Sequence, residues 1–186
     1  MSATSQPFGL RPVYSPSGVV RPVAMSIVSG YGSNILQNQP VKIGTNGTIE
    51  AAAIGDRFVG SFQGVEFTDS DGRRRVSNKW TSGTSATDII AYVTVDPSIV
   101  YEIQSSATIA VADIGSQADF TTITAGSTVT GLSQLMLDQA TLTTAASASL
   151  RILNASPGPD NAFGDNFVIL QVQIAEHQFV ADRVAF

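Results

Sequence analysis

Residue types that build catalytic or covalently stapled proteins are scarce in this 186-residue sequence. It has no cysteine, one histidine (His177) and one tryptophan (Trp80). Without cysteine there are no disulfides and no thiolate metal sites, and one histidine leaves too few good ligands for zinc. The sequence also has no Gly-x-Ser-x-Gly elbow. We therefore expect a non-enzymatic chain in which His177 is a surface or interface residue, with a His177-dependent hydrolase as a minor alternative.

Charge is scarce as well. Asp, Glu, Lys and Arg make up 13% of the chain, where a typical globular protein has about 25%. Apolar residues make up 43%, so the composition is not that of a disordered protein. We expect a surface rich in neutral Ser, Thr, Asn, Gln and Gly, which suits extended contact with other proteins. An unspecialised soluble β protein is the alternative.

Long apolar runs and phosphate-binding loops are missing too. No run approaches the roughly 18 residues of a membrane span, and residues 1–7 lack the features of a secretory signal. We expect a soluble protein made in the cytoplasm, with no membrane partner. The chain has no Gly-x-Gly-x-x-Gly or Walker motif, and its net charge is −5. These features argue against a nucleotide cofactor and against nucleic-acid binding.

The charges that are present are unevenly distributed. Residues 1–80 carry eight basic and five acidic residues, a net of +3, whereas residues 81–186 carry two and ten, a net of −8. The densest cluster is Arg73, Arg74 and Arg75, which follow an Asp-Ser-Asp-Gly turn. Because arginine binds carboxylates bidentately, we predict an inter-protein salt-bridge site at this hairpin tip. A solvated tip and chance clustering are the alternatives.

Short apolar runs between turn residues predict an all-β fold. Gly-Thr-Asn-Gly at 44–47 is a strong hairpin signal, and Gly60 and Gly64 suggest bulges in a strand over 57–67. Strict alternation over 167–174 predicts a strand with one apolar face, and helix is confined to one turn at 110–115. The regular spacing favours a small β-barrel or β-sandwich, tulip- or jelly-roll-like. The other predicted strands are 23–28, 40–43, 48–52, 73–80, 89–95, 99–104, 120–123, 128–132, 135–138 and 150–153.

The first 22 residues differ from the rest in their four prolines. Proline fixes φ and lacks the N–H donor, so this segment cannot be helix and is a poor central strand. Its apolar residues are too widely spread to form a core of their own. We predict an extended N-terminal arm over 1–22, loose or laid across a neighbour, joined to a β-rich domain over 23–186.

The stretch from Pro7 to about Asp119 resembles the capsid decoration (cement, head-stabilising) proteins of tailed bacteriophages. The matching segments are 7–12 (Pro-Phe-Gly-Leu-Arg-Pro), 26–34, 40–43, 47–49, 56–65, 96–97 and 100–104, with 164–168 added by the tail. The resemblance implies a small β domain on the outer capsid surface of the virion. It also implies the major capsid protein as partner, gripped by the arm, and self-association, with a homotrimer favoured and a homodimer possible.

The resemblance and the residues together predict where such contacts would lie. The predicted interface residues are Phe8, Leu10, Arg11, Tyr14, Arg21, Arg73, Arg74 and Arg75. A carbohydrate-binding β-sandwich module is the alternative function, and its candidate stacking platforms are Trp80, Tyr31, Tyr92 and Tyr101. No catalytic, cofactor or metal site is predicted.

Overall fold

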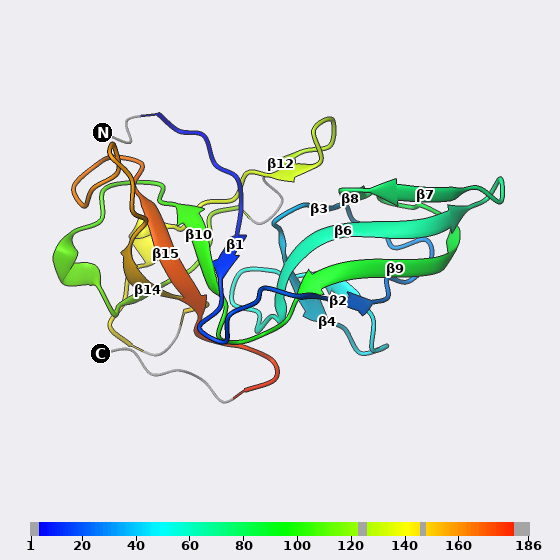
Figure 1. Ribbon diagram of the computed structural model, residues 1–186, viewed down its shortest axis with the longest axis horizontal. Helices are drawn as coiled ribbons and strands as arrows, with labels where there is room; N and C mark the ends of the chain where they lie inside the picture. The colour runs from blue at the N-terminus through cyan, green and yellow to red at the C-terminus, as the bar shows by residue number, and fades with distance from the viewer. Residues whose placement is uncertain (1–3, 123–125, 146–147, 181–186) are drawn as a thin grey trace.

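The structure is a computed structural model that describes residues 4–122, 126–145 and 148–180 (Figure 1). Strands dominate, and the helical pieces among these residues are two short 3₁₀ turns, η1 (Val111–Asp113) and η2 (Gln139–Thr141). The strands pair antiparallel in sheets with open edges. The all-β prediction is therefore confirmed, in a sandwich-like form. The barrel alternative is wrong for the described residues, because no sheet closes on itself.

A five-stranded sheet occupies one half of the molecule (Figure 1). Strand β15 shows the predicted alternation, with Leu170, Val172 and Ile174 buried and the residues between them half-buried. The strand order is β1 (Arg11–Tyr14), β10 (Val100–Gln104), β15 (Ile169–Ile174), β14 (Leu150–Ala155) and β11 (Gln117–Ala118).

A six-stranded sheet forms the other half. Its order is β2 (Pro22–Met25), β9 (Ala86–Thr94), β6 (Gly60–Asp69), β4 (Pro40–Ile43) and β5 (Ile49–Ala51), with β7 (Arg74–Ser77) also paired to β6. Both predicted hairpins, β4–β5 and β6–β7, are confirmed. Gly64 lies at a register shift between β6 and β9, as its predicted bulge requires.

Two smaller pairs complete the strands: β3 (Ile35–Leu36) with β8 (Lys79–Trp80), and β12 (Gly126–Ser127) with β13 (Leu132–Ser133). The predicted strand over 128–132 is wrong, because its first four residues form the turn of the β12–β13 hairpin. Val129 is 91% exposed there, so its β-branched side chain gave a false strand signal. The predicted strands at 120–123 and 135–138 are reduced to isolated bridges of Leu137 with Phe120 and with Ser105, and Ile123 lies outside the described residues.

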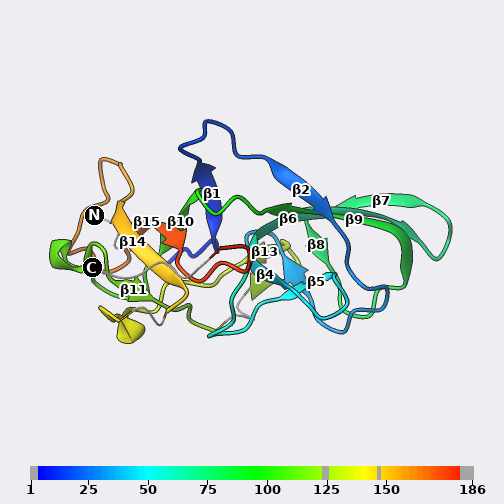
Figure 2. The same cartoon turned by 90° about the horizontal axis from the view of Figure 1, so that it is seen from below.

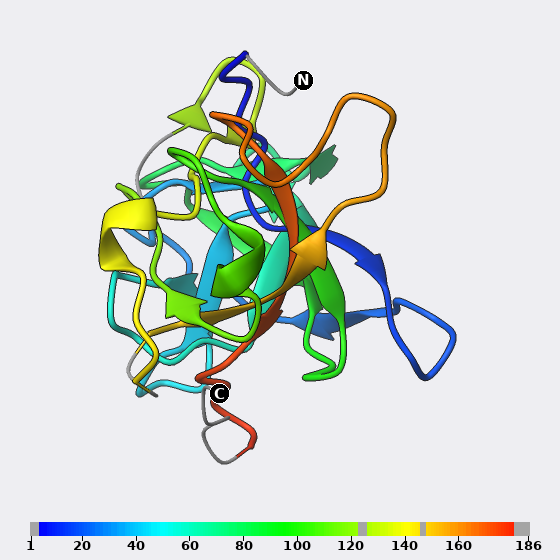
Figure 3. The same cartoon turned by 90° about the vertical axis from the view of Figure 1, so that its left-hand side faces the viewer.

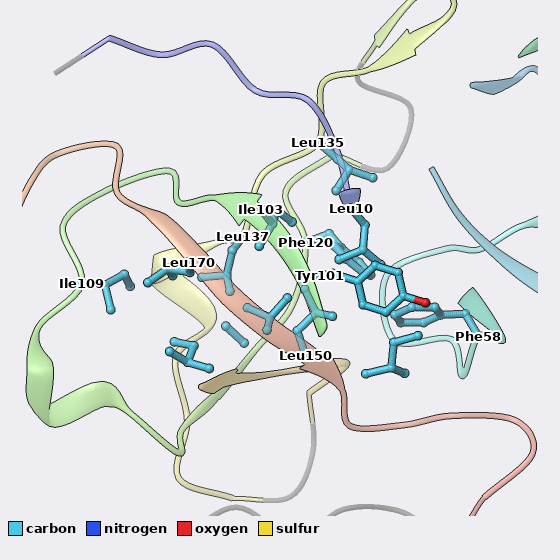
Figure 4. Packing of buried hydrophobic residues seen from close by; sticks show 14 of the residues in the cluster. Leu10, Phe58, Tyr101, Ile103, Ile109, Phe120, Leu135, Leu137, Leu150 and Leu170 are labelled. Atoms are coloured by element: carbon cyan, nitrogen blue, oxygen red, sulfur yellow. The ribbon is translucent and has the colours of Figure 1, made fainter. Parts of the chain in front are cut away.

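Each half has its own apolar core. The five-stranded half buries a cluster that includes Phe58, Tyr101, Phe120 and Leu170 (Figure 4). The six-stranded half buries a second cluster around Phe62 and Trp80. Leu10, from the N-terminal segment, is fully buried in the first cluster, where Figure 4 shows it among Tyr101 and Phe120. Leu10 therefore joins the N-terminal segment to this core.

Candidate protein-binding surfaces

The N-terminal segment, predicted to be an arm that lies loose or across a neighbour, packs on its own chain. The N–H of Leu10 donates to the Asn38 carbonyl at 2.8 Å, and the Ser61 hydroxyl donates to the Leu10 carbonyl at 2.7 Å. Farther back, the Gln6 N–H donates to the Gln104 side chain at 2.8 Å. The segment thus bonds to both halves of the molecule. Its apolar residues lack a local core, as the sequence indicated, but residues distant along the chain provide one.

Gly9 explains how this segment fits so closely. Its φ of +76° lies in the left-handed region that favours glycine. A Cβ atom there would lie 2.6 Å from the Asn38 carbonyl oxygen and 2.8 Å from Cβ of Ser133. A larger residue would push the segment away from its groove. The Pro-Phe-Gly-Leu-Arg-Pro motif is therefore used inside the fold.

Of the predicted interface residues near the N-terminus, Leu10 is fully buried and is unavailable for contact. Arg11 is engaged within the chain: its guanidinium forms an ion pair with Glu102 and lies 4.4 Å from the centre of the Phe8 ring. About half of the Arg11 side chain is still exposed. Phe8 is half-buried, whereas Tyr14 and Arg21 are exposed.

Tyr14 and Arg21 lie in the segment that runs from β1 to β2, and we call a set of exposed residues in this segment the β1–β2 ridge. It consists of Val13, Tyr14, Val19, Arg21 and Val23, whose apolar members are 41%, 44%, 71% and 44% exposed in that order. Figures 2 and 3 show the connection between β1 and β2 projecting from the body of the molecule. Exposed aliphatic and aromatic side chains that lie together on a surface are typical of interaction sites.

Two local features hold the ridge in shape. A register shift between Pro12 and Tyr14 marks a β-bulge, in which β1 has one residue more than its partner strand. In a regular strand the side chains of neighbouring residues point to opposite faces, and a bulge interrupts this alternation. Val13 and Tyr14 are exposed together as a result. At the base of the loop, the Ser15 hydroxyl, itself buried, donates to the Asp96 carboxylate at 3.1 Å. The backbone N–H of Ser98, with the hydroxyls of Ser15 and Ser17, lowers the pKa of Asp96.

The arginine cluster lies at the tip of the β6–β7 hairpin, as predicted, but two of its three side chains have partners. Arg75 forms an ion pair with Asp69. Arg74 lies 3.2 Å from the Glu66 carboxylate and donates to the Asp88 carbonyl at 2.7 Å. Arg73 is exposed, and its side chain has no ion pair among the described residues. It is the arginine available to a partner.

Beside Arg74, a polar network crosses the outer face of the six-stranded sheet. The Tyr92 hydroxyl donates to Glu66 at 2.6 Å. This hydrogen bond lowers the pKa of Glu66, and the contact with Arg74 lowers it further by a smaller amount. In return, the Glu66 carboxylate raises the pKa of Tyr92. Val76, opposite Glu66 on β7, is 80% exposed. The exposure of Val76 and of the ridge valines could not be predicted, because exposed and buried strand valines look alike in one sequence.

The hairpin and the β1–β2 ridge are separate surfaces. In Figure 1 the β6–β7 tip lies at one end of the long axis, and β1 lies toward the middle.

The charges also differ between the two halves of the molecule. Residues 22–94, which form the six-stranded half, include six basic and six acidic residues. The other described residues include three basic and eight acidic residues. The acidic character predicted for residues 81–186 thus belongs to the five-stranded half.

His177 is not the surface or interface residue that we expected. It is fully buried, and its Nδ1 accepts a hydrogen bond from the Phe179 N–H at 3.1 Å. Its backbone forms a bridge with Phe58 where the chain leaves β15, which draws the side chain inward. Full burial counts against a solvent-facing catalytic base. No group of three or more Asp, Glu or His side chains suited to a metal ion occurs within the described parts of the chain.

The structure also separates the four candidate stacking aromatics. Trp80 and Tyr101 are fully buried and cannot stack on a sugar. Burial raises the pKa of Tyr101, whose hydroxyl is hydrogen-bonded to Thr94. Tyr92 is 37% exposed, and half-buried Tyr31 lines a surface hollow.

No protein-family model, curated protein or solved structure matches this chain. The part of the chain that the structure describes contains no helix long and apolar enough to cross a membrane.

Proposed function

We propose that this chain is a non-enzymatic structural protein that binds other protein surfaces, as a capsid decoration protein of a tailed bacteriophage. In this role it lies on the outer surface of the virion and links neighbouring copies of the major capsid protein. The observation that carries the proposal is the β1–β2 ridge, whose exposed apolar side chains lie on and beside a projecting connection that is held at its base by the Ser15–Asp96 hydrogen bond. The assignment to capsids rests on the sequence resemblance.

The composition of the ridge suits a protein contact. Tyrosine and arginine are enriched among the residues that contribute most to binding, and aliphatic neighbours exclude water around them. The ridge supplies Tyr14, Arg21 and three exposed valines. On a shell with many identical sites, a molecule that holds several subunits at once gains effective concentration at each further contact. Modest single contacts then produce lasting attachment.

The arginine hairpin supports contact between copies. Arg73 is the unpaired cation of the tip, while the described residues of the five-stranded half carry three basic and eight acidic residues. A hairpin of one copy would meet the acidic half of the next with complementary charge, which favours association and fixes its register. We favour a homotrimer, with a homodimer as the alternative.

Substitutions on the ridge test the proposal better than deletion of residues 1–22, because Leu10 belongs to the core. The double variant Tyr14→Ser/Val19→Ser removes two exposed apolar side chains and leaves the core untouched. We expect its affinity for phage heads that lack the protein to fall roughly tenfold or more. A tenfold loss corresponds to about 1.4 kcal/mol of binding free energy, and loss of side chains at the centre of a protein contact costs this much or more. Co-sedimentation over a range of protein concentrations measures this affinity.

Val111→Ser/Ile114→Ser is the matched control. Both residues are exposed, at 63% and 43%, and they lie in or next to η1 on the five-stranded half, away from the ridge. This variant should bind heads like the unmodified protein. Equal binding by the ridge variant and the unmodified protein would contradict the role of the ridge.

A further inference from the structure

A hollow of about 410 Å³ opens beside β3, and no residue of the arginine hairpin or of the ridge lines it. It is formed by the loop before β3, the end of β5, the turn after β8 and the start of the β12–β13 hairpin. Its volume falls within the roughly 300–1,000 Å³ that is usual for small-molecule sites. None of the predicted interface residues lines it.

The side chains that line the hollow are neutral. They combine hydroxyl and amide groups from Tyr31, Ser33, Asn34 and Ser82 with apolar surface from Leu36 and Ala51. A charged ligand would find no ion-pair partner among the lining residues and would lose hydration. A ligand with many hydroxyls and an apolar C–H face would find donors, acceptors and apolar surface together.

The polar groups of the hollow are held in place by the fold. The Asn34 Oδ1 accepts from the Ser82 N–H at 2.8 Å, and the Ser82 hydroxyl donates to the Gly32 carbonyl at 2.8 Å. The Tyr31 hydroxyl accepts from the Ala51 N–H at 3.0 Å and keeps its own proton to donate. The Asn34 Nδ2 has no hydrogen-bond partner among the described residues, so its two donors are available to a ligand. Preorganised groups of this kind reduce the entropy cost of binding.

We propose that this hollow binds a neutral sugar unit, with the Asn34 amide and the Tyr31 hydroxyl as donors. The site is independent of the ridge and of the proposed attachment to capsids. Of the four aromatic residues considered as stacking platforms for carbohydrate, only Tyr31 lines this hollow. Trp80 and Tyr101 are buried in the cores, and Tyr92 lies on the outer face of the six-stranded sheet.

Gly32 allows a blocking variant with little cost to folding. It lines the hollow, its φ is not in the left-handed region, and an added Cβ would meet nothing within 4 Å. Gly32→Leu therefore places a side chain at the site without backbone strain. Gly158→Leu is the matched control, since Gly158 lies in the other half and an added Cβ would meet only Cβ of Asn161, at 3.8 Å.

The lone tryptophan provides the readout. Trp80 pairs with Ile35, which lies between the lining residues Asn34 and Leu36. Trp80 emission and titration calorimetry would be followed while the methyl glycosides of glucose, galactose, mannose and N-acetylglucosamine are added in turn. The emission without ligand also verifies that each variant is folded.

We expect saturable binding of at least one glycoside, with Kd of about 1 mM or below, reduced at least tenfold by Gly32→Leu and unchanged by Gly158→Leu. Asn34→Asp keeps the acceptor for the Ser82 N–H and removes the amide donors, so it too should weaken binding. The proposal is overturned if no glycoside saturates, or if folded Gly32→Leu binds like the unmodified protein. Neither result bears on attachment to capsids, which the ridge variants test separately.

Discussion

Gly9 shows how a single residue decides the course of the N-terminal segment. Its left-handed backbone and its close approach to Asn38 and Ser133 leave no space for a side chain. The residues on either side depend on it, because Leu10 enters the core only if the chain turns at this point. The requirement is invisible in the sequence, where Gly9 looks like any loop glycine between prolines.

We predict that Gly9→Ala lowers the free energy of unfolding by about 3 kcal/mol or more, combining left-handed strain with overpacking. Gly47→Ala is the matched control. Gly47 has nearly the same positive φ, +74°, but nothing lies within 4 Å of its added Cβ. It should cost only the backbone strain, about 1–2 kcal/mol. Urea unfolding followed by Trp80 fluorescence and circular dichroism measures both. Equal losses of unfolding free energy in the two variants would show that the close packing around Gly9 does not contribute to stability.

Among the elements, the hairpins were predictable and the N-terminal segment was not. The turns at 44–47 and 69–72 are specified by residues within each turn, and their strands pair with the next stretch of chain. The segment around Leu10 depends instead on Asn38, Ser61 and Gln104. Partners this remote leave no local signal, so the prolines and scattered apolar residues predicted an extended arm, loose or laid across a neighbour.

The candidate site was predictable only in part, for the same reason. Tyr14, Arg21 and Arg73 are exposed as expected. The exposure of Val13 depends on a bulge that follows from pairing with β10, and the ion pairs of Arg74 and Arg75 depend on the register of β6 and β7. The burial of His177 follows from its bridge with Phe58. None of these pairings can be obtained from one sequence.

The β6–β7 hairpin makes a prediction about pH. Arg75 lowers the pKa of Asp69 from its ordinary 3.8, and Tyr92 with Arg74 lowers that of Glu66 from 4.5. A carboxylate with a lowered folded pKa stabilises the fold above its unfolded pKa, and this contribution is lost as the pH falls through the folded pKa. The Asp69–Arg75 ion pair should therefore be lost only in acid below pH 3.8, and the Glu66–Arg74 ion pair only below pH 4.5.

Carboxyl NMR titration of Asp69 tests this directly. Arg75→Gln should raise the pKa of Asp69 toward 3.8. Arg73→Gln should leave it unchanged, because Arg73 contacts Asp69 through its backbone N–H, which the substitution retains. A midpoint that both variants move equally would show that general charge near the tip, and not the specific ion pair, controls Asp69.

At the scale of the whole molecule, two sheets with separate cores are joined by the N-terminal segment and by crossings of the chain between β1 and β2 and between β9 and β10. The first of these crossings projects from the body of the molecule (Figure 2), and the exposed residues of the β1–β2 ridge lie on it and on the two strands that it joins. The cationic hairpin tip lies at the far end of the six-stranded half (Figure 1). Two separate candidate surfaces on one molecule would suit the proposed role of joining neighbours.

The most direct test is a difference map from electron cryomicroscopy of phage heads with and without the bound protein. The proposed function predicts added density for both sheets on the outer surface, at symmetry or local-symmetry axes, with the β1–β2 ridge facing the major capsid protein. Heads that gain no ordered density at saturating protein, or that carry the protein only inside the shell, would contradict it.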